Sequence, residues 1–230
     1  MIGIFDSGIG GLSVYREIRK LLPREDYVYY ADNAHCPYGE KTREYITGRA
    51  REITEILISK GADIIVVACN TATAAAISTL RAEYPIRFIG MEPAVKPAVA
   101  MTKTGVVGHI GQGFVELVES GETSGPHAEE VVRNSLKPLL DEGADTIVLG
   151  CTHYPFLIDV IRKIAGPGVT VIDPAPAVAR HLLEVMQEEG LLRGNPDSND
   201  ASDTGKESPG HSEFLSSGPD NILKKLVSKL

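Results

Sequence analysis

Short apolar runs alternate with amphipathic segments through the first ninety residues of the chain. The apolar runs predict strands at 2–5, 26–32, 62–70 and 85–91, and the segments between them predict helices at 12–23, 40–61 and 71–84. The run at 62–70 is almost continuously apolar, which is typical of a strand buried on both faces of a parallel sheet. This alternation predicts an α/β fold with helices on both faces of the sheet.

The same alternation restarts in the second half. Strands are predicted at 104–110, 144–153 and 169–174, and helices at 129–143, 154–166 and 177–192. A polar loop at 195–211 precedes a last strand at 212–217 and a helix at 221–230. We therefore expect two similar α/β lobes, each a mostly parallel sheet flanked by helices.

Polar side chains follow several of these strands. In open parallel sheets, ligands bind at the carboxyl ends of the strands. Three predicted strand ends carry polar residues that are able to take part in catalysis or binding: Asp6-Ser7, the loop Cys36-Pro37-Tyr38-Gly39, and Cys69-Asn70-Thr71.

Two of the strands belong to a repeated frame. GADIIVVACNTATAA begins at Gly61 and GADTIVLGCTHYPFL begins at Gly143, and each reaches a cysteine at its ninth position, Cys69 and Cys151. A single buried cysteine is more often a small core residue than a functional one. Because the whole frame is repeated, a functional role is favoured for both cysteines.

Two thiols that face each other across one carbon atom suit an inversion of configuration. One thiolate removes a proton from one face, and one thiol returns a proton to the other face. Asp6 and His153 are placed to assist these proton transfers. Hydrogen-bond donors suited to a substrate carboxylate, where they would stabilise the charge that spreads into it, are predicted at Ser7, Asn70, Thr71, Thr152 and the amides near Tyr38-Gly39.

Composition narrows the class of protein. Hydrophobic residues make up 43% of the chain and charged residues 23%, as in ordinary soluble domains. The net charge of -8 argues against a nucleic-acid partner, because phosphate binding requires a basic surface. No apolar run is long enough to span a membrane and no signal-peptide pattern opens the chain, so we expect a cytoplasmic protein with reduced thiols. The chain has no closely spaced C-x2-C or H-x3-H pair, so no metal is expected.

Four motifs resemble the cofactor-independent aspartate/glutamate racemase family, and in particular its glutamate racemases: IGIFDSGIGGLSV, DNAHCPYG, VVACNTATA and VLGCTHYPFL. The resemblance extends from Ile2 to about Arg180. It implies two α/β domains, formed by 1–94 with 176–230 and by 95–175, and an active site between them. It also implies that the chain interconverts L- and D-glutamate without a cofactor and supplies D-glutamate for bacterial peptidoglycan. A homodimer is the assembly that the resemblance leads us to expect.

The resemblance further implies roles for single residues. Cys69 and Cys151 are the two bases, with Cys69 serving the D-enantiomer and Cys151 the L-enantiomer. Asp6 assists Cys69, His153 assists Cys151, and Glu119 matches an acid near the second cysteine. The expected substrate-binding residues are Asp6, Ser7, Pro37, Tyr38, Gly39, Asn70, Thr71, Thr152 and His153.

The chain departs from the family pattern after Gly108. There the family continues with a strand–helix–strand unit of roughly 30 residues, which this chain lacks. A shortened second lobe leaves open a relative that binds an amino acid without inverting it. The residues are also compatible with a racemase of aspartate or another amino acid, and with a thiol hydrolase that uses Cys69 alone.

Three further features are interpreted as structural. Cys36 belongs to no repeated frame and is expected to pack within its loop. Gly8, Gly10 and Gly11 are expected to serve a tight turn and the packing of the helix that follows. The charged run at 43–55 is expected to be the solvated face of a helix.

Overall fold

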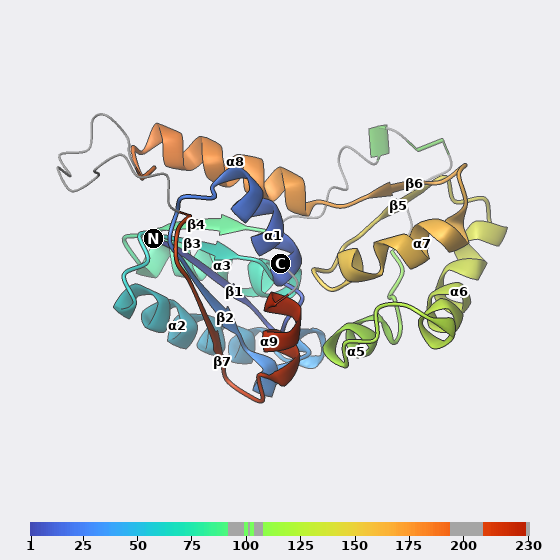
Figure 1. The fold of residues 1–230 in the computed structure, drawn as a ribbon, viewed down its shortest axis with the longest axis horizontal. Coiled ribbons are helices and arrows are strands. Elements are labelled where there is room, and N and C mark those ends of the chain that lie inside the picture. The colour runs from blue at the N-terminus through green and yellow to red at the C-terminus, as the bar shows by residue number, and fades with distance from the viewer. Residues whose placement is uncertain (92–98, 101, 104–107, 194–208, 229–230) are drawn as a thin grey trace.

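The computed structural model describes residues 1–91, 99–100, 102–103, 108–193 and 209–228, which form two α/β lobes lying next to each other (Figure 1). The first lobe is built on a five-stranded sheet and the second on a two-stranded sheet. The strands are β1 Ile2–Asp6, β2 Tyr27–Ala31, β3 Ile64–Val67, β4 Arg87–Gly90, β5 Thr146–Val148, β6 Thr170–Ile172 and β7 Ser212–Ser216. The α-helices are α1 Leu12–Leu21, α2 Arg43–Ser59, α3 Asn70–Glu83, α5 Phe114–Glu119, α6 Pro126–Asp141, α7 Ile158–Ala165, α8 Ala175–Glu188 and α9 Asn221–Val227.

The sheet of the first lobe is parallel throughout, with the strand order β4-β3-β1-β2-β7. Every residue of β1, β2 and β3 is buried, which explains why these segments are nearly continuous apolar runs in the sequence. Alternate side chains of the strands enter two different cores, because successive residues of a strand point to opposite faces. Helices α1 and α8 cover one face of the sheet, and α2 and α3 cover the other (Figure 1).

The order of the strands places the chemistry-bearing residues together. The chain leaves β1 for β2 on one side and returns to place β3 on the other side, so the connections diverge between β1 and β3. Ligands of open α/β sheets bind outside the carboxyl ends of the strands at such a switch point. Here those ends carry Asp6, the last residue of β1, and Cys69, two residues after β3.

The second lobe is smaller but follows the same plan. Its strands β5 and β6 are parallel, and helices α6 and α7 pack against each other beside them. One apolar core runs from Ile4 and Tyr29 of the first lobe to Leu117 and Leu157 of the second, so the lobes share buried surface. The predicted α/β class with mostly parallel sheets is therefore confirmed, while the domain boundaries drawn from the sequence remain a prediction.

Some predicted elements differ from the structure. The predicted strand 104–110 lies partly outside the described residues, and 108–110 carry no strand. Most of the predicted loop 195–211 also lies outside the described residues. The loop at 33–40 contains two short 3-10 helices, η1 Asn33–His35 and η2 Tyr38–Glu40, and a third, η3 Tyr154–Leu157, precedes α7. None of the described helices combines the length and apolar character needed to cross a lipid bilayer.

A buried ion pair fixes the loop that follows β2. Asp32 is fully buried and accepts hydrogen bonds from Arg49 Nε at 3.0 Å and Nη2 at 2.8 Å, and from the Tyr38 hydroxyl at 2.6 Å. Burial opposes the charge of Asp32, but these hydrogen bonds outweigh it and lower the pKa of the carboxyl group. The expectation that the charged run 43–55 is the solvated face of a helix therefore fails at Arg49, whose side chain is only 15% exposed.

We predict that Arg49→Met lowers the free energy of unfolding by about 3 kcal/mol, because it leaves the buried Asp32 carboxylate without its cation. The matched control is Arg51→Met on the same helix, since Arg51 also forms two hydrogen bonds to one carboxylate, that of Glu83, but at the surface. This control is expected to change stability much less. Urea unfolding of the two variants measures both effects, and equal losses would contradict the assignment.

Candidate active site

The repeated frame has the same local structure in both lobes. Gly61 ends the helix before β3 with φ +92°, and Gly143 ends the helix before β5 with φ +87°, a conformation that favours glycine. Each strand then leads to a cysteine beyond its carboxyl end, and a helical segment follows: α3 begins at Asn70, directly after Cys69, and η3 begins at Tyr154, three residues after Cys151. The frame is repeated because each copy ends a helix, builds a strand and delivers a thiol.

Cys69 is a buried thiol at the start of α3. Its sulfur accepts a hydrogen bond from Ala72 N at 3.4 Å and lies 3.7 Å from the Ser7 hydroxyl. Burial raises the pKa of Cys69 to about 12, and the nearby negative charge of Asp6 acts in the same direction. Cys69 therefore carries its proton at neutral pH.

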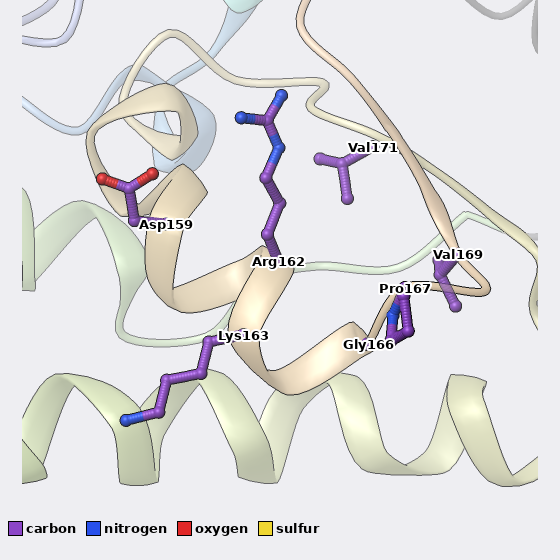
Figure 2. Close-up of a pocket in the computed structure, with 7 residues that line it drawn as sticks. All are labelled: Asp159, Arg162, Lys163, Gly166, Pro167, Val169 and Val171. Atoms are coloured by element: carbon purple, nitrogen blue, oxygen red, sulfur yellow. The ribbon is translucent and has the colours of Figure 1, made fainter.

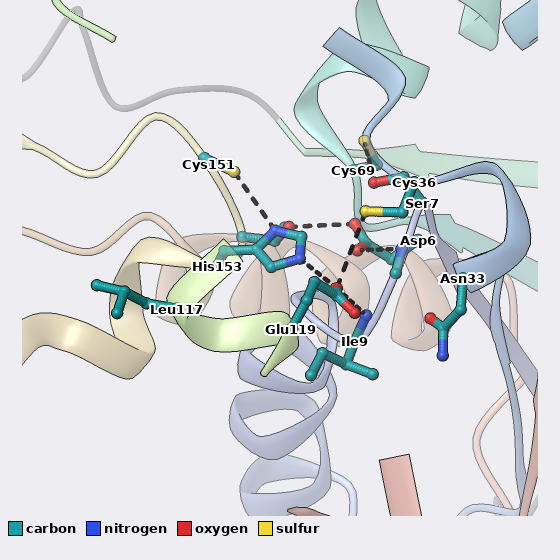
Figure 3. A network of polar contacts seen from close by, with 12 residues as sticks. Asp6, Ser7, Ile9, Asn33, Cys36, Cys69, Leu117, Glu119, Cys151 and His153 are labelled. Atoms are coloured by element: carbon teal, nitrogen blue, oxygen red, sulfur yellow. Dashed lines mark hydrogen bonds and ion pairs between the residues drawn. The ribbon is translucent and has the colours of Figure 1, made fainter. Parts of the chain in front are cut away.

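Cys151 lies in a different electrostatic environment. Its sulfur is 3.6 Å from His153 Nδ1, and His153 Nε2 is 2.6 Å from Glu119 Oε1, which also accepts a hydrogen bond from Ile9 N at 2.9 Å (Figure 3). Burial alone would lower the pKa of His153, but its contacts with Cys151, Cys36 and Glu119 raise that pKa well above the ordinary value. A protonated imidazole therefore bridges the thiol and the carboxylate.

Asp6 of the first lobe forms a second contact between the lobes, through Thr152. Its carboxylate accepts hydrogen bonds from Gly8 N at 3.0 Å and from Thr152 Oγ1 at 3.1 Å. Thr152 is also held through its carbonyl oxygen, which accepts a hydrogen bond from the Ser13 hydroxyl at 2.9 Å. Burial raises the pKa of Asp6. Two residues of the first lobe, Asp6 and Ser13, therefore hold Thr152, which lies between Cys151 and His153.

The glycine-rich turn after β1 allows this close contact. None of Gly8, Gly10 and Gly11 has a positive φ, so backbone conformation does not require glycine at these positions. A methyl group on Gly8 would collide with Glu119 Oε1, and one on Gly10 would lie 2.5 Å from His153 Nδ1. The interpretation of Gly8 and Gly10 mainly as turn and helix-packing residues is therefore incomplete, because they make room for side chains of the second lobe.

Asn70 carries unused hydrogen-bonding capacity next to Cys69. Both polar atoms of its side chain, Oδ1 and Nδ2, are buried and lack a hydrogen-bond partner among the residues that the structure describes. Buried polar groups are nearly always paired, so an orphaned donor and acceptor indicate a place for a ligand. Thr71 is half-buried in the same first turn of α3. The free donor and acceptor of Asn70 suit an amino acid, which offers both a carboxylate and an ammonium group.

The loop residues expected to bind substrate differ in what they offer. The Tyr38 hydroxyl is engaged by Asp32 in the first lobe, whereas Pro37 is half-buried and Gly39 is exposed. Cys36 was expected to pack within its own loop. Its sulfur instead lies 3.9 Å from Glu119 Oε1, beside the pair that Glu119 forms with His153. No spacing in the sequence connects Cys36 with Glu119, because the two residues come from different lobes.

Two open pockets lie on the second lobe away from the cysteines. One, of about 550 Å³, is lined by α7 and β6 residues that include Arg162, Lys163 and Val171 (Figure 2). The other, of about 660 Å³, is lined by residues that include His109 and Ser135. Neither contains a thiol, so the candidate chemistry lies in the network of Figure 3.

The two frame cysteines should differ in reactivity. At pH 8, a thiol with a pKa of about 12 is ionised to about 1 part in 10⁴. Iodoacetamide should therefore label the half-buried Cys151, which faces an imidazolium, before the buried Cys69. Peptide mass spectrometry measures the order, with urea-unfolded protein as the control in which both react alike. Equal rates in the folded protein would contradict the described environments.

Known proteins resemble this chain over its whole length. The sequence pattern of the Asp/Glu/Hydantoin racemase family matches residues 2–119 and 105–182. The chain is 44% identical to a glutamate racemase of Methylococcus capsulatus, with 100% of this chain and 91% of the relative covered. That alignment spans 257 positions, whereas this chain has 230 residues, so at least 27 positions of the alignment have no residue of this chain.

Solved structures of glutamate racemases match the fold of this chain. Glutamate racemase of Bacillus anthracis matches with a TM-score of 0.82 and 29% identity, covering 100% of this chain and 92% of that one. Glutamate racemase of Francisella tularensis, in complex with D-glutamate, matches with a TM-score of 0.79 and 26% identity, covering 99% and 92%. The resemblance inferred from the four motifs is confirmed: the chain belongs to the Asp/Glu/Hydantoin racemase family.

Proposed function

We propose that this chain is a glutamate racemase that interconverts L- and D-glutamate by proton transfer between Cys69 and Cys151. The observation that carries the proposal is the pair of thiols, one from each lobe, in opposite electrostatic environments. Cys69 is kept protonated by burial and by Asp6, whereas Cys151 faces a protonated His153. One group therefore serves as the acid and the other as the base.

The resting arrangement is suited to L-glutamate. The Cys151 thiolate, stabilised by the His153 imidazolium, removes the α-proton, and the Cys69 thiol donates its proton to the opposite face of the same carbon. The product is D-glutamate, with Cys151 now a thiol and Cys69 a thiolate. The reverse reaction exchanges the two roles, and proton exchange with solvent restores the resting form.

Glu119 acts through His153 in this proposal. Its carboxylate pairs with Nε2 of the ring, so that Nδ1 stays protonated and directed at Cys151. Asp6 acts on Cys69 through its charge and on the second lobe through the Thr152 hydroxyl. The two acids therefore keep the thiols unequal and in place.

Substrate recognition is proposed for the groups around Cys69. Asn70 has a free donor and a free acceptor, and Ser7 and Thr152 carry hydroxyl groups in the same network. Donors aimed at the α-carboxylate stabilise the negative charge that moves into it as the α-proton leaves. The D-glutamate bound to the Francisella relative supports glutamate as the substrate.

The wider role is also proposed from the family. D-glutamate made in the cytoplasm would supply peptidoglycan synthesis, and a homodimer remains the default assembly. The two-stranded second sheet favours one alternative, a relative that binds an amino acid without inverting it. A racemase of aspartate would use the same thiols with a different side-chain pocket.

Turnover of each enantiomer by three serine variants tests the proposal. Cys69→Ser and Cys151→Ser should each lower kcat for L-glutamate by at least about 10²-fold, because a hydroxyl is a far weaker acid than a thiol. Cys36→Ser is the matched control: Cys36 transfers no proton in the proposal, so this variant should lose far less activity than either of the other two. Chiral chromatography of the products provides the measurement.

Three results would each point to a different conclusion. Full racemisation by Cys69→Ser and Cys151→Ser would refute the two-thiol mechanism. Faster turnover of L-aspartate than of L-glutamate would identify an aspartate racemase. Binding of glutamate by calorimetry without any turnover would identify the non-catalytic relative.

A further inference from the structure

A third thiol, that of Cys36, lies against Glu119 and His153 but transfers no proton in the proposed reaction. The Cys36 sulfur, a carboxylate oxygen of Glu119 and a ring nitrogen of His153 all lie within 4.8 Å of one another, as a group of possible metal ligands. They come from the loop after β2, from the end of α5 and from the segment before η3. We propose that these three side chains form an inhibitory Zn²⁺ site that holds His153 and Glu119 in an inactive arrangement.

The set of donor atoms suits zinc. A thiolate, an imidazole nitrogen and a carboxylate oxygen are the three ligand types that Zn²⁺ accepts, and a hard ion such as Mg²⁺ prefers oxygen alone. Three protein ligands leave a fourth tetrahedral position for water. The Glu119 side chain is 23% exposed and Cys36 is half-buried, so the ion can reach the site from solvent.

The distances are close to those of a tetrahedral site. With bonds of about 2.0–2.3 Å, neighbouring ligand atoms lie about 3.3–3.6 Å apart. Cys36 Sγ is already 3.9 Å from Glu119 Oε1. Glu119 Oε1 and His153 Nε2 are 2.6 Å apart and need to separate by less than about 1 Å, which a rotation of the Glu119 carboxylate supplies.

Groups around the ligands are placed to support them. Ile9 N donates a hydrogen bond to Glu119 Oε1 at 2.9 Å, and Cys151 Sγ lies 3.6 Å from the other ring nitrogen of His153. Partners of this kind orient the ligands of protein metal sites. Zn²⁺ would replace the protons on His153 Nε2 and Cys36 Sγ, which are released to solvent.

The consequence for activity rests on the proposed racemase function, whereas metal binding does not. A His153 ring bound to Zn²⁺ through Nε2 is no longer an imidazolium facing Cys151, and Glu119 no longer pairs with it. The first proton abstraction therefore loses its support. Changes in free zinc would then change the rate without any change in fold.

The test measures binding and activity separately in the full chain and in Cys36→Ser. Zn²⁺ held by a metal buffer should inhibit glutamate racemisation by the parent chain, whereas Mg²⁺ should not. Cys36→Ser should raise the Zn²⁺ concentration for half-inhibition at least about tenfold, since even the loss of an outer partner costs that much affinity. Co²⁺ should give a sulfur-to-metal absorption band with the parent chain that Cys36→Ser lacks.

A matched control removes another histidine–carboxylate pair. His127→Gln breaks the exposed contact of His127 with Glu122 at 3.0 Å, which has no cysteine beside it, and should leave zinc inhibition unchanged. Equal inhibition of the parent and Cys36→Ser would overturn the proposal, because the ion would then sit on Cys69 or Cys151. A Co²⁺ band that depends on Cys36 in a chain without racemase activity would refute the proposed function and retain the metal site.

Discussion

The close approach of the second lobe to the glycine-rich turn after β1 is the constraint on which the rest of the site depends. Glu119 and His153 occupy the space that side chains at Gly8 and Gly10 would fill. This contact brings the His153 ring between Cys151 and Glu119 and lets Asp6 accept a hydrogen bond from Thr152. The two copies of the cysteine frame thereby become parts of one site.

The same contact makes the two thiols unequal. Cys69 is enclosed by the first lobe and shares its surroundings with the Asp6 carboxylate, so its pKa is raised to about 12. Cys151 is half-buried and faces the imidazolium. A two-base reaction requires one group that donates a proton and one that accepts it; burial keeps Cys69 protonated, and the proposed mechanism needs no cofactor.

Much of the first lobe follows from the pattern of the sequence. The apolar runs that become β1, β2 and β3 are buried on both faces, and the repeated Gly-Ala-Asp frames are explained by Gly61 and Gly143, each with a left-handed backbone. These features are local, so periodicity and spacing reveal them. The features that the sequence did not reveal depend on contacts between distant segments. Cys36 meets Glu119 only because the lobes close on each other, and Arg49 turns inward only because Asp32 is buried at the end of β2.

The racemisation rate of Gly8→Ala tests this arrangement most directly. The methyl group meets the flexible end of the Glu119 side chain, so the fold should persist while the carboxylate is displaced from His153. We expect kcat to fall by about 10²-fold, as for a misplacement of about 1 Å, with little change in stability. Gly48→Ala, where the added methyl group meets nothing within 4 Å, should keep the parent rate. A Gly8→Ala variant with the full rate would contradict the claim that this close approach positions the catalytic groups.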